Sequence, residues 1–357
     1  MGRSLMRYDA DVGFTYMPST KIRVQGMGGG YLVRTNTSGF RSDREFTKER
    51  ATGSFRVLLF GDSQSAGDGM VNALRYSDLL EQKVPGLEVQ NYAVSGTGTD
   101  QHYLTYMQQR SVEHDLVVIG LYAENIRRVS RRILMSADAN GDVTYRSKPY
   151  FTLDGERLEL CNVPVPKRTW TEETVGDEHR AHVLRFGDEY AALKEAPQWL
   201  AGLPGRLSPD GSARQLARAL RQRLSGGRMH PLPEYDRADN DEWQLLRAIL
   251  MAWIARSSVP VVILLLPHET ALTGVSDPTN YQQRFAELSR DTGCEVVDAL
   301  PRLASNDAQP SRFWSASSGH LSEVGHEAIA DLLAPLVRAR MPHPAENSRP
   351  DHLRTCG

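Results

Sequence analysis

The chain has 357 residues, of which 24% are charged, and its formal net charge is −2. A chain of this length holds one large domain with an insertion, or two domains. So small a net charge gives no global field that would attract nucleic acid or a membrane surface. The three cysteines, Cys161, Cys294 and Cys356, are odd in number and widely spaced. This pattern fits a reducing compartment and gives neither a disulfide framework nor a zinc site.

The sequence shows no sign of membrane insertion or export. The first residues lack the apolar core of a signal peptide. The longest uninterrupted apolar run, from Val259 to Pro267, is far too short to span a bilayer. We therefore expect a soluble, cytoplasmic protein, and the sequence leaves its oligomeric state open.

Residues 1–54 are rich in Gly, Thr and Arg and show little periodicity, which predicts an extended N-terminal segment. The glycine run from Gly26 to Gly30 has no buried strand before it and no helix after it. We interpret it as a turn and not as a phosphate-binding loop, because such a loop joins a buried strand to a helix.

From residue 55 the sequence alternates between short buried runs and helix-like patterns. The expected strands are 57–60, 87–92 and 116–122, and the expected helices are 73–83 and 101–111. Buried strands that alternate with helices predict a parallel sheet covered on both faces. The same alternation resumes later, with helices at 242–256 and 281–292, strands at 260–267 and 295–298, and a last amphipathic helix from 323 to about 340. Ser322 is the expected N-cap of that last helix.

Between these two stretches, residues 136–240 break the pattern. We expect a turn at 138–142, a hairpin around 150–160 and a short basic helix at 213–224. This composition predicts an insertion without a core of its own, which caps the site and sets its specificity, since loops at that edge of a sheet carry function. The polar, proline-rich tail at 342–357 is expected to be disordered.

The sequence Gly61-Asp62-Ser63 directly follows the first buried strand. Gly61 can adopt backbone angles that other residues avoid, which predicts a sharp turn at this point. The turn would leave the Ser63 hydroxyl at the C-terminal edge of the sheet, where α/β proteins bind ligands. A nucleophilic serine and an ordinary helix N-cap both fit this position, and free backbone N–H groups at a helix start can stabilise an anion.

Three further segments fall at the same edge of the predicted sheet. Gly96 and Gly98 follow the second strand, Asn125 follows the third, and His320 precedes the last helix. A nucleophile, oxyanion donors and a base would converge there.

These four blocks, in this order, resemble those of the SGNH (GDSL-type) hydrolase superfamily. The resemblance covers 55–135 and 241–341, and it implies a three-layer α/β/α fold with a mainly parallel, flavodoxin-like sheet. The stretch from Thr35 to Arg41 is loosely similar to members associated with bacterial polysaccharide or secondary-metabolite acyl chemistry.

The resemblance also implies roles for individual residues. Ser63 would be the nucleophile and His320 the base, and the Ser63 N–H, the Gly96 N–H and the Asn125 amide would hold the oxyanion. Gly98 is the competing glycine donor, and Gly96 is preferred because it stands closer to the strand end. The implied protein is a serine esterase that removes a small acyl group, such as acetyl, from a carbohydrate or related metabolite. It needs no cofactor and no metal.

The sequence departs from the family at one position. Members usually carry an Asp two or three residues before the His, to orient the imidazole. Ser318 and Ser317 stand there in this chain. Three possibilities follow: a backbone carbonyl or serine hydroxyl orients His320, an acid arrives from elsewhere with Asp307 as the nearest upstream candidate, or activity is weak or lost.

Two alternatives to an esterase therefore stay open. The same acyl-enzyme could pass its acyl group to a sugar hydroxyl, which would make the protein an O-acyltransferase. Alternatively, the protein could be a catalytically silent binding module that keeps the pocket. A nucleotide-binding or redox protein is disfavoured, because Gly96 and Gly98 lack the third glycine and the acidic partner of the dinucleotide fingerprint.

Other chemistry-bearing side chains have simpler interpretations. His268 and His326 begin like zinc motifs, but neither has a second His four residues on, so we expect no metal there. The arginines are expected on solvated helix faces, with an anionic substrate, such as a phosphate-bearing acyl carrier or an acidic sugar, as the alternative; they are Arg127, Arg128, Arg131, Arg132, Arg214, Arg218 and Arg221. Three aromatic residues could stack on a sugar ring but more commonly belong to a core; they are Trp170, Phe313 and Trp314.

Overall fold

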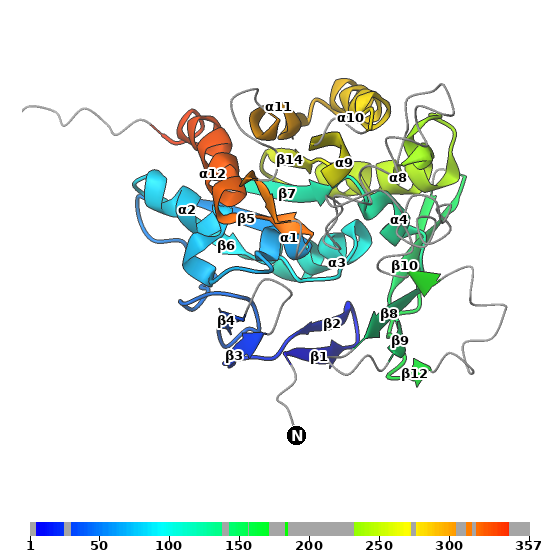
Figure 1. Cartoon of the computed structure of the whole chain (residues 1–357), viewed down its shortest axis with the longest axis horizontal. Helices are drawn as coiled ribbons and strands as arrows, with labels where there is room; N and C mark the ends of the chain where they lie inside the picture. The colour runs from blue at the N-terminus through cyan, green and yellow to red at the C-terminus, as the bar shows by residue number, and fades with distance from the viewer. Residues whose placement is uncertain are drawn as a thin grey trace, which may run out of the picture.

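The structure is a computed structural model of the whole chain (Figure 1). It describes residues 5–24, 30–137, 143–155, 157–170, 183–184, 232–272, 276–304, 312–315 and 319–342. The expected turn at 138–142, the basic helix at 213–224 and the tail at 343–357 lie outside these residues. None of the described helices is long and apolar enough to cross a membrane.

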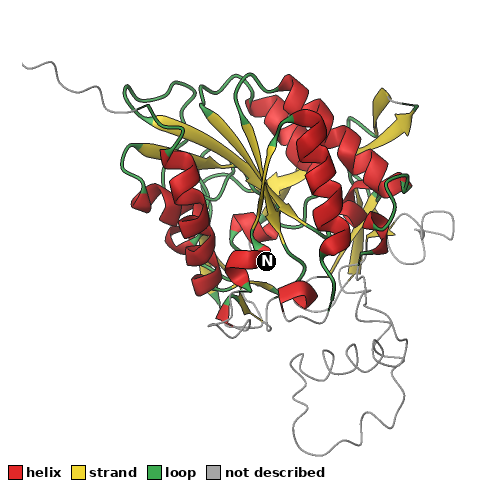
Figure 2. Cartoon of the chain, turned by 90° about the horizontal axis from the view of Figure 1, so that it is seen from above, coloured by secondary structure: helices red, strands yellow, loops and turns green. Residues whose placement is uncertain are grey.

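A five-stranded parallel sheet forms the centre of the molecule (Figure 2). Its strands are β5 (Phe55–Gly61), β6 (Leu87–Asn91), β7 (Leu116–Tyr122), β14 (Val261–Leu266) and β15 (Glu295–Asp298). They lie in the order β6-β5-β7-β14-β15, and every pair is parallel. This is the flavodoxin-like order, in which the strand order reverses between β5 and β7. The predicted fold class is confirmed.

Helices cover both faces of the sheet, so the molecule has three layers. Along β5, Leu58 and Phe60 face one hydrophobic cluster, whereas Val57 and Leu59 face the other. This alternation follows from the two-residue period of a strand. The first cluster packs against α3 (Thr99–Gln109), α8 (Asp241–Arg256) and α10 (Thr279–Thr292). The second packs against α2 (Tyr76–Lys83), α11 (Leu300–Leu303) and α12 (Glu323–Arg338).

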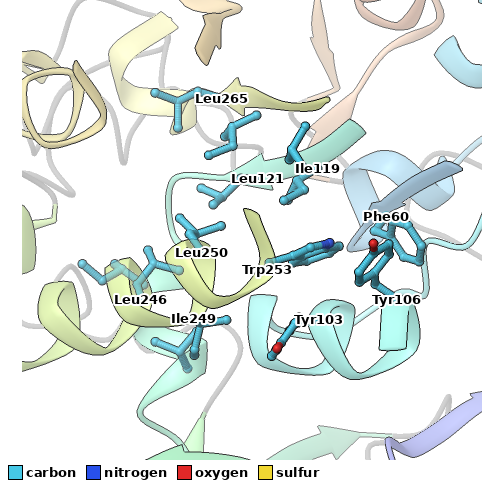
Figure 3. Packing of buried hydrophobic residues seen from close by; sticks show 14 of the residues in the cluster. Phe60, Tyr103, Tyr106, Ile119, Leu121, Leu246, Ile249, Leu250, Trp253 and Leu265 are labelled. Carbon is cyan, nitrogen blue, oxygen red and sulfur yellow. The ribbon is translucent and has the colours of Figure 1, made fainter. Parts of the chain in front are cut away.

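Aromatic rings fill the first cluster beneath the middle of the sheet. Trp253 of α8 is fully buried, with its ring centroid 5.4 Å from Phe60 and 5.4 Å from Tyr106 (Figure 3). Tyr103 lies 5.7 Å from the same indole. Such contacts add to the burial energy and fix α3 and α8 against β5. Because β5 carries the candidate nucleophile at its end, this cluster sets the position of the site.

Most predicted elements occur with small shifts at their ends. The expected helix at 73–83 divides into a 3₁₀ turn, Asn72–Leu74, and α2. Ser322 caps α12 as predicted, because its hydroxyl accepts a hydrogen bond of 3.1 Å from the Gly325 N–H. The expected hairpin consists of β10 (Tyr150–Asp154) and β11 (Arg157–Cys161).

The N-terminal segment is more regular than the sequence predicts. It forms two antiparallel hairpins, β1 (Met6–Asp9) with β2 (Gly13–Tyr16) and β3 (Lys21–Val24) with β4 (Tyr31–Arg34). Each strand has only four residues, too few for a clear period-2 pattern. The segment is also tied to the sheet domain, because the buried guanidinium of Arg41 donates to the carbonyl of Gly67 at 3.0 Å and to that of Met70 at 2.7 Å.

The described residues of 136–240 form mainly strands beside the main sheet domain, together with a 3₁₀ turn at Pro233–Tyr235. β8 (Ile133–Ala137), β9 (Val143–Ser147), β12 (Thr169–Trp170) and β13 (Val183–Leu184) make a separate sheet in the order β12-β9-β8-β13. The predicted capping role of the insertion stays a prediction.

Candidate active site

Ser63 is the first residue of a short helix, α1 (Ser63–Ala66), which begins where β5 ends. Asp62 caps this helix, and its Oδ1 accepts the Gln64 N–H at 3.0 Å. Ser63 itself is 9% exposed. The cap is therefore Asp62 and not the serine, which leaves the Ser63 hydroxyl without a capping role.

Gly61 is required at this turn because a side chain there would clash with its neighbours, and not because of its backbone angles. It is absent from the glycines with positive φ in the described part of the chain. A Cβ on Gly61 would lie 2.3 Å from Ser65 Oγ and 2.9 Å from the Gly120 carbonyl oxygen. Gly120 is its neighbour in register on β7, and a Cβ there would lie 2.2 Å from the same hydroxyl. The expectation of unusual backbone angles at Gly61 was wrong. Gly61 and Gly120 lack side chains at the positions where a Cβ would clash with Ser65.

The loop after β6 favours Gly96 over Gly98 as a backbone donor. The Gly98 N–H already donates to Gln101 Oε1 at 3.1 Å. Gly96 has a φ of +79°, and within the described residues its N–H has no acceptor. Its neighbour Ser95 is held twice, because its N–H donates to Tyr16 Oη at 3.0 Å and its hydroxyl to Asp68 Oδ1 at 2.5 Å.

Asn125 begins the short helix α4 (Asn125–Val129), three residues after the end of β7. Its side chain is fully buried. Neither Oδ1 nor Nδ2 of its carboxamide has a hydrogen-bond partner in the part of the chain that the structure describes. A buried amide without partners is rare in folded proteins, because each unpaired group costs about 1–3 kcal/mol. The carboxamide lies near the strand-order reversal, where doubly wound α/β sheets bind their ligands.

Arg128 connects the three parts of the site. Its Nη1 donates to Asp62 Oδ2 at 2.9 Å and to the Thr97 carbonyl at 3.0 Å. Asp62 precedes Ser63, Thr97 follows Gly96, and Arg128 itself lies on α4, one turn after Asn125. Both charged side chains are almost completely buried, with exposures of 7% and 0%. The expectation of a solvated arginine was wrong here, because the guanidinium of Arg128 turns inward to pair with buried Asp62 and the Thr97 carbonyl.

A second buried ion pair, between Lys148 and Asp100, anchors the backbone of α4. Lys148 Nζ contacts Asp100 and also donates to the Arg128 carbonyl at 3.0 Å and to that of Arg131 at 3.2 Å. Burial raises the pKa of Asp62, while the charge of Arg128 acts in the opposite direction. These contacts keep the charges paired, as charged groups in an interior require.

His320 lies on β17 (His320–Leu321), which pairs with β16 (Trp314–Ser315) just before α12. It is partly exposed. The Gln64 side chain reaches this strand on both sides of the histidine: its Oε1 accepts the Leu321 N–H at 3.0 Å, and its Nε2 donates to the Gly319 carbonyl at 3.2 Å. The candidate base is thus attached to the residue that follows Ser63. Asp307, Ser317 and Ser318 lie outside the described residues, so the partner of the imidazole stays open.

The other predicted residues lie away from this edge or have structural contacts. His326 is fully buried, and its Nδ1 accepts the Tyr76 N–H at 3.1 Å. His268 Nδ1 lies 2.7 Å from Thr270 Oγ1 in a buried turn. Phe313 and Trp314 belong to the second core cluster. Arg127 pairs with Glu234 at 2.6 Å. The side chain of Trp170 and the residues Arg214, Arg218 and Arg221 lie outside the described part.

The rest of the described structure offers no metal site, but it contains a cavity. Among the described residues, no group of three or more His, Cys, Asp or Glu side chains could hold a metal ion. A cavity of about 170 Å³ lies between the first hairpin and α3, with Val12, Phe14 and His102 in its lining. Ser63, Asn125 and His320 do not line it, so this cavity is separate from the candidate active site.

Comparisons with known proteins find similarity at the level of structure. No family model matches the sequence, and no curated protein matches it significantly. Solved structures similar to the chain include a lipolytic protein of the G-D-S-L family from Veillonella parvula, with 9% identity over 80% of this chain and 99% of that one and a TM-score of 0.40. The lipase/acylhydrolase from Enterococcus faecalis has 13% identity over 81% and 97%, with a TM-score of 0.41. A carbohydrate acetylesterase family member from Sinorhizobium meliloti has 11% identity over 80% and 99%, with a TM-score of 0.35. At these TM-scores the similarity carries no weight for the chemistry of this chain, which has to come from its own residues.

The structure adds residues to the site that the sequence did not indicate. Gln64 and Tyr16 had no role in the prediction, and Arg128 was expected on the surface. Only Arg128 had a usable signal: it follows Asn125 by three residues, which places both on adjacent turns of one helix. The contacts of Gln64 and Tyr16 join segments far apart in the sequence, and no local pattern reveals them.

Proposed function

We propose that the protein is a serine esterase of the SGNH type that releases a small acyl group, such as acetyl, from a carbohydrate or related metabolite. Ser63, Gly96, Asn125 and His320 would carry the reaction. One observation supports this more than any other: the buried carboxamide of Asn125, which has no hydrogen-bond partner among the described residues, lies on the helix that Arg128 ties to the Ser63 turn and the Gly96 loop.

In the first half of the reaction, the Ser63 hydroxyl attacks the ester carbonyl while His320 takes its proton. The carbonyl oxygen becomes an oxyanion, which the N–H groups of Ser63 and Gly96 and the amide of Asn125 stabilise. Each such donor contributes about 3–4 kcal/mol to the rate when it is held in place beforehand. The leaving alkoxide then receives the proton from His320, and the acyl group stays on Ser63.

In the second half, water replaces the alcohol. His320 takes a proton from the water, the water oxygen attacks the acyl carbon, and the same donors hold the second oxyanion. Collapse breaks the bond to Ser63, whose oxygen takes the proton from His320, and the product leaves as the carboxylic acid, which then loses its own proton to solvent. Asn125 is fully buried, so the substrate oxygen reaches it only when the side chains that cover it move.

A phosphonate ester tests the nucleophile directly. A p-nitrophenyl phosphonate forms a stable adduct only with a serine whose proton a base removes. We expect peptide mass spectrometry to find the adduct on Ser63 of the wild type and on no residue of Ser63→Ala. His320→Ala should lower the labelling rate by about 100-fold or more, the size of a general-base contribution. Equal labelling of all three proteins would contradict the proposal.

A further inference from the structure

Gln64 connects the candidate nucleophile to the candidate base. Its side chain is 2% exposed and makes two hydrogen bonds, one to the residue before His320 and one to the residue after it. Its own N–H is fixed by Asp62 Oδ1 at 3.0 Å. A single buried amide thus spans the histidine on both sides, from a position next to Ser63 in the chain.

In the described part of the chain, the backbone hydrogen bonds around this strand run within its own hairpin and toward α12. β17 pairs with β16 over only two residue pairs, Trp314 with Leu321 and Ser315 with His320. On the other side, the Ser322 N–H donates to the Phe313 carbonyl at 2.9 Å, and α12 follows. These bonds shape the hairpin, whereas the two hydrogen bonds from Gln64 set the distance between the hairpin and the turn that carries Ser63.

The chemistry of the side chain matters, because the two bonds run in opposite directions. Gln64 Oε1 accepts from Leu321 and Nε2 donates to Gly319, which only a group with both an acceptor and a donor can do. An ionised carboxylate accepts but cannot donate, and an aliphatic side chain does neither. A protonated carboxylic acid does both.

We propose that Gln64 is a positioning residue for His320: its amide holds the backbone on both sides of the base at a fixed distance from Ser63. The inference rests on the proposed esterase function and assigns to Gln64 a task in it that acts through the histidine. Loss of the amide leaves the substrate pocket intact and weakens proton transfer between Ser63 and His320.

The test uses aryl acetate hydrolysis by wild type, Gln64→Leu and Gln64→Glu. The leucine of Gln64→Leu has nearly the same size as glutamine but makes neither hydrogen bond. Because His320 is then misplaced relative to Ser63, kcat should fall about 10- to 100-fold, and KM should change less than about twofold. Gln90→Leu is the matched control. Gln90 is also fully buried and also donates to a backbone carbonyl, that of Thr47, but it lies on β6 away from His320. Its loss should lower the melting temperature and leave kcat near the wild-type value.

Gln64→Glu supplies a pH signature that a merely structural role does not produce. At about pH 8 the ionised carboxylate that this variant introduces cannot donate to the Gly319 carbonyl, and kcat should fall as in Gln64→Leu. Burial raises the pKa of a carboxyl group, so the side chain gains a proton as the pH falls toward about 6. The ratio of its kcat to that of the wild type should then rise severalfold, because the acid restores both bonds. Taking the ratio removes any pH dependence that the wild type and the variant share.

The outcomes separate this inference from the proposed function. An active wild type, an inactive Ser63→Ala and an unchanged kcat in Gln64→Leu would overturn the role of Gln64 and leave the esterase standing. A pH-independent ratio for Gln64→Glu would overturn it as well. A wild type that neither turns over the ester nor reacts with the phosphonate would refute the esterase, and the positioning role with it.

Discussion

The two sides of Ser63 are built in different ways. On the oxyanion side, buried charges join the parts: Arg128 bridges Asp62 and Thr97, and Lys148 holds the helix that carries it. On the histidine side, one neutral amide, that of Gln64, joins the base to the nucleophile turn. The oxyanion side is thereby fixed by interactions that are costly to break, and the histidine side by two ordinary hydrogen bonds. Damage to the first should cost both stability and rate, and damage to the second mainly rate.

The largest effect should come from Arg128→Leu. The change leaves Asp62 buried without its ion-pair partner, which typically costs about 3–5 kcal/mol of folding free energy. It also frees α4 from the Ser63 turn, so kcat should fall at least about tenfold. Urea unfolding and aryl acetate kinetics measure the two effects.

Arg127→Leu is the matched control for this change. Its ion pair with Glu234 is partly exposed, at 23% and 18%, and such pairs contribute about 1 kcal/mol or less. A loss of stability in Arg128→Leu no larger than in this control would contradict the view that buried charges fix the oxyanion side.

Asn125→Ala should act on rate alone. Removing one oxyanion donor lowers kcat about 100- to 1,000-fold, while KM stays close to its wild-type value. Stability should hold or rise, because the change removes a buried amide that has no partner among the described residues. The measurement is kcat beside the free energy of unfolding. An unchanged kcat would remove Asn125 from the site.

Each side also contains a buried histidine that is sensitive to acid. His102 bonds to Thr97 on the oxyanion side, and His326 bonds to Tyr76 behind the His320 strand. Burial lowers the pKa of each from 6.5 to about 3, helped by Arg128 and Lys148 for His102 and by Arg75, Arg41 and His320 for His326. The unfolded chain therefore takes up protons below pH 6.5 that the folded chain does not.

Their contribution to stability is thus present above pH 6.5 and is lost as the pH falls toward about 3. Well inside this pH range, each histidine should lower the free energy of unfolding by about 1.4 kcal/mol for every unit by which the pH falls. Urea unfolding over a pH series measures the slope. His326→Asn keeps an acceptor for the Tyr76 N–H. It should reduce the number of protons taken up on unfolding, which sets the slope of stability against pH, by about one. The same slope in wild type and variant would show that His326 is not neutral in the folded state.

The smallest effect is expected from Tyr16→Phe. The phenol holds Ser95, which precedes Gly96, through bonds of 2.6 and 3.0 Å. Losing them should cost about 1 kcal/mol of stability and lower kcat severalfold, because the Gly96 loop loses its link to the first hairpin. An unchanged kcat would mean that Asp68 alone fixes this loop.

The sequence predicted the parallel sheet well, because buried runs such as those of β5 and β7 have a clear strand pattern, whereas its flavodoxin-like order was implied only by the family resemblance. It also predicted Gly96 and Asn125 at one edge, since the ends of parallel strands meet there. It did not predict what holds these residues in place. Arg128 looked solvated because it lies among four arginines, and its burial depends on Asp62, sixty-six residues earlier in the chain. Gln64 contacts a strand more than 250 residues away, and the strands of the N-terminal hairpins are too short to show a period.

The most direct test of the central claim is aryl acetate hydrolysis by the wild type and by Ser63→Ala, measured from about pH 6 to 9 around the usual pKa of histidine. We expect measurable turnover in the wild type and a loss of about 10⁴-fold or more in Ser63→Ala, with both proteins folded. Equal rates in the two proteins, or no turnover by the folded wild type, would contradict it.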